Sequence, residues 1–368
     1  MAIINLIGAL PADRDHAANT AALQDLAVAL AETAPRDCSV RYLVPRDVAA
    51  PEFDNPLVSV EQFTLAENAL GLLWQSGALA RTLDGELLHS LTPLAPIRAR
   101  KQADGSQATV TVPHLEVFSE NAADANSVAG GTRLSVRAQR RYYKRALQLA
   151  QQVVVPTYEL AQQLQADFGF TGAQVVPLAA PNVFLAGGDA AERRAALRLP
   201  DAAYFVTFLH TQAELRELLP VITELAPAHP PLLVITSAPL EIPAEYAGEL
   251  DERVLLVHPR EVADVGAILE QATLLLVPQG ATTMNFEVYA ALAAGVPLVC
   301  NAANSQVTEL MLDAGETFES FAELPGLLGG ILDDAEKRER LSLLAHDRAT
   351  GFSWENTART LWHLHASL

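Results

Sequence analysis

Short apolar runs alternate with segments of helical periodicity along most of the chain. The runs are rich in Val, Leu and Ile and too short for buried helices, so they indicate strands that are buried on both faces. They lie at 2–7, 40–44, 153–155, 204–209, 232–236, 254–257 and 273–277. Segments with apolar residues at helical spacing, such as 20–33, separate them. This alternation of strand and helix predicts an α/β protein with parallel sheets.

The clearest strand–loop–helix unit covers residues 272–300. A buried strand over 273–277 is followed by a small, polar loop over 280–285. A helical pattern then starts at Phe286, and Gly295 stands where a left-handed residue should end the helix. A second strand follows, so the unit is βαβ. The N-terminus of such a helix can bind a phosphate through its backbone N–H groups.

Three segments resemble the retaining glycosyltransferases of family 4, also called group 1, which have the GT-B fold. Pro278 and Gly295-Val296-Pro297 stand at the family's spacing without a gap. Residues 153–160 resemble the family's strand and Pro-Ser turn, and Phe352-Ser353-Trp354 resembles the start of its C-terminal helix. The resemblance extends over nearly the whole chain.

The resemblance implies two Rossmann-like domains that face a central cleft. We expect an acceptor-side domain over 1–185, a linker over 186–198 and a nucleotide-sugar domain over 199–352. A C-terminal helix over 353–368 is expected to cross back onto the first domain. The implied activity is transfer of a sugar from a nucleoside-diphosphate sugar to a small-molecule, glycan or peptide acceptor, without a metal or other cofactor.

The same resemblance shows which family residues are replaced. In the gapless register, Thr282 and Ala290 stand where the family has two glutamates, one near the donor sugar and one at the nucleotide ribose. The Arg-Lys pair that neutralises the leaving diphosphate is reduced to Arg216, with no lysine. The framework of the family is therefore present, whereas its donor site is divergent.

Candidate site residues follow from these positions. We expect catalytic roles for His114, one position after the family's histidine beside the transferred sugar, and for Glu287, about one helical turn before Ala290. The expected donor-binding residues are Gly8, Gly280, Thr282, Thr283, Asn285, Arg216 and Glu309. In the alternative interpretation, His114 only caps a strand. Asp13 and Asp15 match a metal motif so weakly that we expect a solvated loop and no metal there.

Charge and cysteine usage narrow the function classes. A formal net charge of −19 argues against nucleic acid, which requires clustered Lys and Arg. The basic stretch 137–145 is either the solvated face of a scaffold helix or an anion site. Cys38 and Cys300 match no metal or redox spacing and are expected to be buried thiols. Since there is no basic leader and no apolar run of about 18 residues, we expect a cytoplasmic protein.

Three functional hypotheses remain open at this point. The first is a divergent sugar transferase. The second is a pseudo-glycosyltransferase that uses the fold to bind a glycan, a peptide or a partner subunit, which the loss of several charged donor groups favours. The third is a GT-B enzyme whose donor carries no nucleoside diphosphate.

Overall fold

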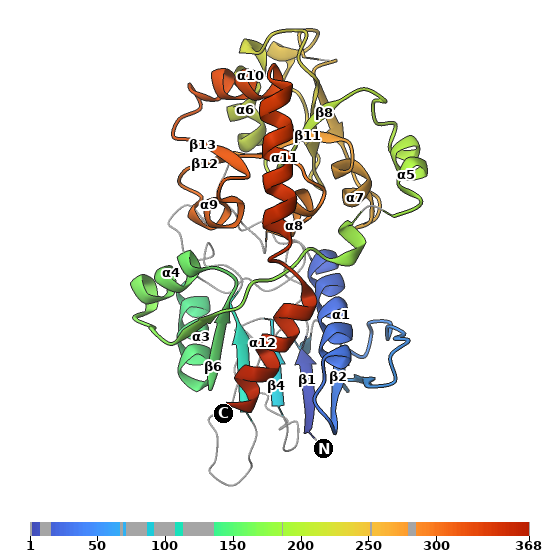
Figure 1. Cartoon of the computed structure of the whole chain (residues 1–368), viewed down its shortest axis with the longest axis vertical. Helices are drawn as coiled ribbons and strands as arrows, with labels where there is room; N and C mark the ends of the chain where they lie inside the picture. Colours follow the sequence, from blue (N-terminus) through green and yellow to red (C-terminus); the bar gives the residue numbers. More distant parts are fainter. Residues whose placement is uncertain are drawn as a thin grey trace. The chain divides into compact units, whose positions relative to one another are not determined.

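The structure is a computed structural model that describes residues 2–7, 16–66, 69–70, 87–91, 107–112, 136–185, 187–250, 252–278 and 285–367. The described residues form two compact units. One contains the residues up to 179 together with 353–367, and the other contains the residues from 180 to 352. Each unit has its own parallel sheet with helices around it (Figure 1).

The described part of the first unit holds a seven-stranded sheet in the order β3-β2-β1-β4-β5-β6-β7. The strands are β1 (Ala2–Ile7), β2 (Cys38–Val44), β3 (Val58–Gln62), β4 (Leu87–Ser90), β5 (Gln107–Thr111), β6 (Gln152–Val155) and β7 (Ala173–Val175). The helices are α1 (His16–Glu32), α3 (Val136–Leu149), α4 (Tyr158–Phe168) and the C-terminal α12 (Trp354–Ala366). The strand predicted at 2–7 is confirmed, and Thr157 caps α4 by accepting the Leu160 N–H at 3.2 Å.

The C-terminal helix α12 packs on the first unit. The Trp362 indole Nε1 donates to the backbone oxygen of Leu30 at 3.0 Å, and the Thr357 hydroxyl donates to that of Pro177 at 2.6 Å. Figure 1 shows α12, coloured red, beside α1. Ser353 caps α12 by accepting the Asn356 N–H at 3.2 Å. The first strand and the last helix therefore belong to the same unit.

The second unit holds a six-stranded sheet within its described residues, in the order β10-β9-β8-β11-β12-β13. The strands are β8 (Tyr204–Phe208), β9 (Leu232–Ile235), β10 (Val254–Val257), β11 (Ala272–Val277), β12 (Leu298–Asn301) and β13 (Gly315–Phe318). The helices are α5 (Ala190–Leu197), α6 (Gln212–Glu224), α7 (Asp264–Leu269), α8 (Phe286–Ala293), α9 (Ser305–Met311), α10 (Leu324–Leu332) and α11 (Ala335–Ala349), with 3-10 turns η3 (Asn182–Phe184) and η4 (Ala244–Tyr246).

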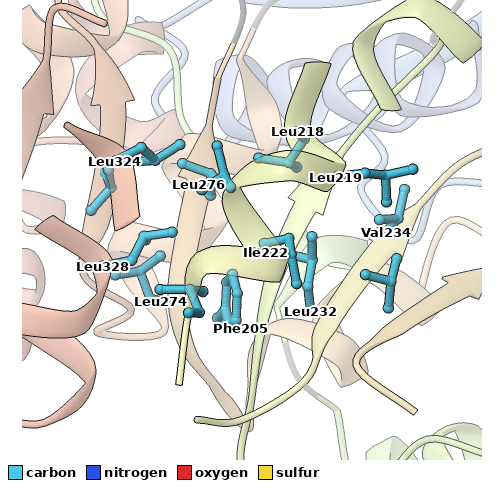
Figure 2. Packing of buried hydrophobic residues seen from close by; sticks show 14 of the residues in the cluster. Phe205, Leu218, Leu219, Ile222, Leu232, Val234, Leu274, Leu276, Leu324 and Leu328 are labelled. Carbon is cyan, nitrogen blue, oxygen red and sulfur yellow. The ribbon is translucent and has the colours of Figure 1, made fainter. Parts of the chain in front are cut away.

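The core of the second unit explains why its strands could be predicted from apolar runs. Figure 2 shows one face of the sheet packed against α6 and α10, with Phe205, Leu232, Val234, Leu274 and Leu276 from strands and Leu218, Leu219, Ile222, Leu324 and Leu328 from helices. Every residue of β8 except Phe208 is buried, so this strand packs on both faces. Gly295 follows α8 with a φ of 69°, the left-handed conformation expected there.

The change of unit falls between residues 179 and 180, before the boundary predicted at 185. The turn η3 lies against α7, and Gly266 allows this approach, because a Cβ there would come within 2.7 Å of the Phe184 backbone oxygen. The stretch 186–198, expected to be a linker, contains α5, which packs on α7. Of the two free cysteines, Cys300 is buried as predicted, whereas Cys38 is partly exposed.

Two buried histidines meet between β4 and α12 in the first unit. His89 and His365 are 1% and 4% exposed, and their ring centroids lie 6.4 Å apart. His89 Nε2 shares a hydrogen bond of 3.2 Å with the Thr111 hydroxyl, and neither ring nitrogen of His365 has a partner among the described residues. Burial, and to a smaller extent the charge of His365, lowers the pKa of His89 to about 3, and burial lowers that of His365 to about 4. Both rings are therefore neutral at pH 7.

We expect the free energy of unfolding to fall as the pH drops from 6.5 towards 4. The unfolded chain protonates both histidines near pH 6.5, whereas the folded chain takes up these protons only near its lower pKa values, so acid favours the unfolded state. Each histidine contributes up to about 1.4 kcal/mol per pH unit in this window.

Thermal unfolding between pH 4.5 and 7.5 measures this effect. His365→Gln removes one titrating ring and should flatten the acid decline of the midpoint. His363→Gln, at an exposed position of the same helix, should not. Equal slopes for the two variants would contradict this account of the buried pair.

Candidate functional site

The second sheet has one position at which its strand order reverses. From β8 the chain proceeds through β9 and β10 in one direction, and from β11 it proceeds through β12 and β13 in the other. β8 and β11 are neighbours and parallel, with Val206 opposite Leu275 and Thr207 opposite Leu276. Ligands of open α/β sheets bind at the carboxyl ends of the strands where the order reverses. The candidate site therefore lies at the carboxyl ends of β8 and β11 and at the starts of α6 and α8.

The turn after β8 is closed by a capping box at the start of α6. Thr211 accepts the backbone N–H of Glu214 at 3.2 Å, and the Glu214 carboxylate reaches back to two backbone amides. Its Oε2 accepts the N–H of His210 at 2.7 Å and that of Thr211 at 2.9 Å. A side chain of the protein itself therefore satisfies the two amides that directly precede α6.

Asn285 directly precedes α8. This residue is 3% exposed and has a φ of 58°, a left-handed conformation that is uncommon for a residue with a Cβ. Its side chain does not cap the helix, although its backbone oxygen accepts the N–H of Val288 at 2.9 Å. Glu287, in the first turn of α8, is partly exposed. Ala290 is 1% exposed and lies on the buried face of α8.

Side chains also occupy the turns after β10 and β12. The Asp264 Oδ2 accepts the N–H groups of Arg260 at 2.8 Å and Glu261 at 3.0 Å, and Asn304 caps α9 through Val307 N–H at 3.2 Å. Although burial raises the pKa of Asp264, these amides and the nearby guanidinium of Arg193 hold it below its ordinary value. Asp264 is therefore ionised at pH 7, and its carboxylate holds this turn through two backbone amides.

Arg193 of α5 is engaged by acidic residues of the same unit. It contacts Asp189 at 2.7 Å, Glu261 at 2.8 Å and Asp264 at 3.1 Å. Hydrogen bonds to Glu261, Asp264 and Asp189 raise the pKa of Arg193 above its ordinary value. A cavity of about 210 Å³ lies beside it, lined by Asn182, Val183, Leu185, Gly187, Asp189, Ala190, Arg193, Ala263 and Ala267. With three carboxylates around it, this guanidinium is not a candidate for neutralising a ligand phosphate.

Five of the nine predicted site residues lie outside the described residues and four lie within them. The five outside are Gly8, His114, Gly280, Thr282 and Thr283.

The described site residues belong to three helices, which follow the adjacent strands β8, β11 and β12. Arg216 is exposed on α6, and Asn285 and Glu287 begin α8. Glu309 of α9 is partly buried, and its backbone oxygen accepts Nη2 of Arg348 at 3.1 Å. The topology thus places these four residues on or beside helices that follow neighbouring strands of one sheet, while the roles assigned to them stay predictions.

Sequence reasoning missed the residues that cap the turns, namely Glu214, Asp264 and Asn304. A signal for the first was present, because Thr211 and Glu214 have the Thr-x-x-Glu spacing of a capping box. The Asp264 cap depends partly on Arg193, which is distant in sequence, so spacing alone would not reveal it. Among the described residues, no group of three or more His, Cys, Asp or Glu side chains could hold a metal ion.

Comparison with solved structures decides the fold. A sucrose-phosphate synthase from Thermosynechococcus elongatus superposes with a TM-score of 0.73 at 18% identity, over 100% of this chain and 99% of the other. The Anabaena protein HepE, solved in complex with UDP-glucose, superposes with a TM-score of 0.60 at 14% identity, over 100% of both chains. This chain has the GT-B glycosyltransferase fold.

Sequence comparison finds a relative that is named as a glycosyltransferase. This chain is 27% identical over 256 residues to a D-inositol 3-phosphate glycosyltransferase from Nocardia farcinica, a match that covers 61% of this chain. The match spans 56% of that relative, just over half its length. No protein-family model matches the chain. None of the described helices is long and apolar enough to cross a membrane.

The left-handed backbone of Asn285 leads to a test of the turn before α8. Replacement by Gly or by Ala removes the same side-chain contacts, but only Ala retains a Cβ that strains this conformation. We expect Asn285→Gly to exceed Asn285→Ala by about 1 kcal/mol in unfolding free energy. At Asn356, exposed in the first turn of α12, the order of the two replacements should be reversed.

Thermal unfolding of the four variants measures both differences. If Asn285→Ala were as stable as Asn285→Gly, the left-handed turn would not be required at this position.

Proposed function

We propose that the chain is a glycosyltransferase that takes a sugar from a nucleoside-diphosphate sugar and transfers it to a small-molecule, glycan or peptide acceptor. The reaction breaks the bond between the anomeric carbon and the diphosphate, and an acceptor oxygen forms the new bond and loses its proton. Two comparisons support this proposal. HepE, of the same fold, was solved with UDP-glucose, and the similar protein from Nocardia farcinica is named as a glycosyltransferase.

The reversal of strand order between β8 and β11 is the observation that carries the proposal. Because of this reversal, α6 and α8, which follow the two strands, both begin at the same edge of the sheet. The positive ends of their helix dipoles favour a diphosphate there. α8 has eight residues, and the left-handed Asn285 directly precedes its first residue, Phe286. We infer that the donor phosphates lie at the start of α8.

Individual roles follow from this placement as proposals. Asn285, with Gly280, Thr282 and Thr283 before it, would bind the donor, and Arg216 would add the positive charge that the leaving diphosphate needs. Glu287 would supply the carboxylate nearest to the position of Ala290. His114 would act beside the reacting sugar, and Gly8 and Glu309 would complete the donor site. The cytoplasmic location also stays a prediction.

A pseudo-glycosyltransferase that serves a partner subunit is the second candidate. One observation favours it: Ala290 stands where the family has its ribose-binding carboxylate, and at 1% exposure it offers no polar group to a ribose. A protein of this kind would bind a glycan or peptide, or a nucleotide without turning it over.

We expect a selective rise in thermal stability with one nucleotide when UDP, GDP, ADP and their sugar conjugates are compared. A ligand at about a hundred times its dissociation constant adds about 2.7 kcal/mol to the unfolding free energy, enough to move the midpoint. Uridine, guanosine and adenosine are the matched controls, because they lack the phosphates that the helix N-terminus is proposed to bind.

The same samples separate the two candidates. Release of the free nucleoside diphosphate from the stabilising sugar conjugate, with the sugar transferred to water or to an added acceptor, would support the transferase. Stabilisation without release would support the non-catalytic candidate, and no shift with any nucleotide would overturn the proposed donor site.

A further inference from the structure

Four polar side chains meet inside the first unit, where α12 covers the ends of β4 and β5. His89 of β4 and Thr109 of β5 are register partners on neighbouring strands, so their side chains leave the sheet on the same face. Thr111 lies two residues further along β5, on that face too, and its hydroxyl shares the 3.2 Å hydrogen bond with His89 Nε2. His365 belongs to the last turn of α12, and its ring stands at 79° to that of His89. Two strands and the C-terminal helix therefore build one polar cluster.

The side chains of this cluster are buried, and several of their polar atoms are unpaired. Thr109 is 0% exposed, His89 1% and His365 4%. Within the part of the chain that the structure describes, four atoms have no hydrogen-bond partner: His89 Nδ1, Thr109 Oγ1 and both ring nitrogens of His365. Buried polar atoms are nearly always bonded to protein or to ordered water, because leaving them unpaired costs free energy. A further hydrogen-bonding group is therefore expected among them.

The separation of the two rings indicates the size of this group. A direct N–H···N bond would bring the ring centroids of His89 and His365 to about 5 Å, since the bond itself spans about 2.9 Å. Two rings that bind one water molecule at a tetrahedral angle have centroids about 6 to 6.5 Å apart. The observed separation is 6.4 Å, which leaves room for a single water molecule between the rings.

The chemistry of the cluster also fits water better than a metal ion. Both rings are neutral at pH 7, so each offers one donor and one acceptor, and the Thr109 hydroxyl can donate or accept. A zinc ion bound by both rings would draw their centroids to about 5 Å, because zinc–nitrogen bonds are about 2.1 Å long. Zinc sites also use three or four protein ligands, and the described residues contain no group of three His, Cys, Asp or Glu side chains that could hold a metal.

We propose that one internal water molecule is bound between His89, Thr109 and His365 and links the last turn of α12 to β4 and β5. A buried water molecule makes about three hydrogen bonds to groups that otherwise have no partner, and these three residues offer them. The water acts as a structural ligand that fastens the C-terminal helix to the sheet, in addition to the bond from Trp362 to Leu30 that holds this helix to α1. The proposal is independent of the donor site in the second unit.

Thr109→Val tests the proposal, because valine keeps the branched shape of threonine and removes the hydroxyl. If the hydroxyl binds water, the substitution leaves the water and the two histidines with a broken hydrogen-bond network, and the first unit opens more often. Amide hydrogen exchange in peptides that cover β5 should then become about fivefold faster. If the hydroxyl binds nothing, removal of an unpaired polar atom should leave this exchange unchanged or slow it.

Thr207→Val is the matched control in the second unit. Thr207 is also 0% exposed, and its hydroxyl has no partner among the described residues. Its register partners are the apolar Val234 and Leu276, so it has no polar neighbour on the adjacent strands with which to share a water molecule. Amide exchange in peptides that cover β8 should be unchanged or slower in Thr207→Val.

His365→Phe tests the link to α12, because it keeps a ring and removes both nitrogens. On this background, Thr109→Val should accelerate exchange in β5 less than about twofold, since the two residues act through the same water molecule. A crystal structure of the unchanged protein should show a water oxygen within about 3.2 Å of His89, Thr109 and His365. If His365→Phe does not fold, the crystal structure carries this part of the test.

The proposal would be overturned by unchanged or slower exchange in β5 of Thr109→Val. Equal acceleration of β5 by Thr109→Val and of β8 by Thr207→Val would also overturn it, as would a full effect of Thr109→Val on the His365→Phe background. In the crystal structure, a metal ion at this position, or no water within hydrogen-bond distance of the three side chains, would contradict it directly.

Discussion

The parallel pairing of β8 with β11 is the constraint on which the second unit depends. The chain leaves these neighbouring strands in opposite directions across the sheet, and right-handed crossovers then require α6 and α8 to cover opposite faces. The contacts agree, because α6 contributes to the core with α10, whereas α8 contacts α7 and α9. The turns that begin these helices consequently flank one point of the sheet edge, and this is where a ligand can meet two helix N-termini.

At this edge, the chain has supplied much of the negative charge itself. Glu214 and Asp264 each accept two backbone amides in the turns after β8 and β10. Arg193 is surrounded by three acidic side chains, which leaves Arg216 as the proposed counter-charge for a diphosphate. The proposed donor site would depend on backbone dipoles more than on basic side chains. This agrees with a chain whose net charge is −19 and in which Arg216 alone stands for the family's Arg-Lys pair.

The strands of the second unit could be predicted because they are buried on both faces, so a continuous apolar run identifies each of them. The caps at Thr157 and Ser353 are local in sequence, since each hydroxyl accepts an N–H three residues later. By contrast, β3 is a partly exposed strand without an apolar run, and the pattern did not reveal it. α5 is held by ion pairs from Arg193 to Glu261 and Asp264, which lie about seventy residues away, so a local pattern suggested a linker.

Less of the candidate site could be read from the sequence. The spacing predicted the start of α8 and the replacement by Ala290, and the Thr-x-x-Glu spacing of Thr211 and Glu214 held an overlooked signal for their capping box. It did not indicate the left-handed backbone of Asn285, because that conformation depends on how the chain enters α8.

Hydrogen–deuterium exchange with and without UDP-glucose tests the central claim most directly, since it reports where a nucleotide sugar touches the backbone. The account predicts slower exchange in residues 285–293, at the start of α8, and unchanged exchange at 210 and 211, where Glu214 already accepts both amides. Protection of 210 and 211 without a change in 285–293, or protection in neither stretch, would contradict it.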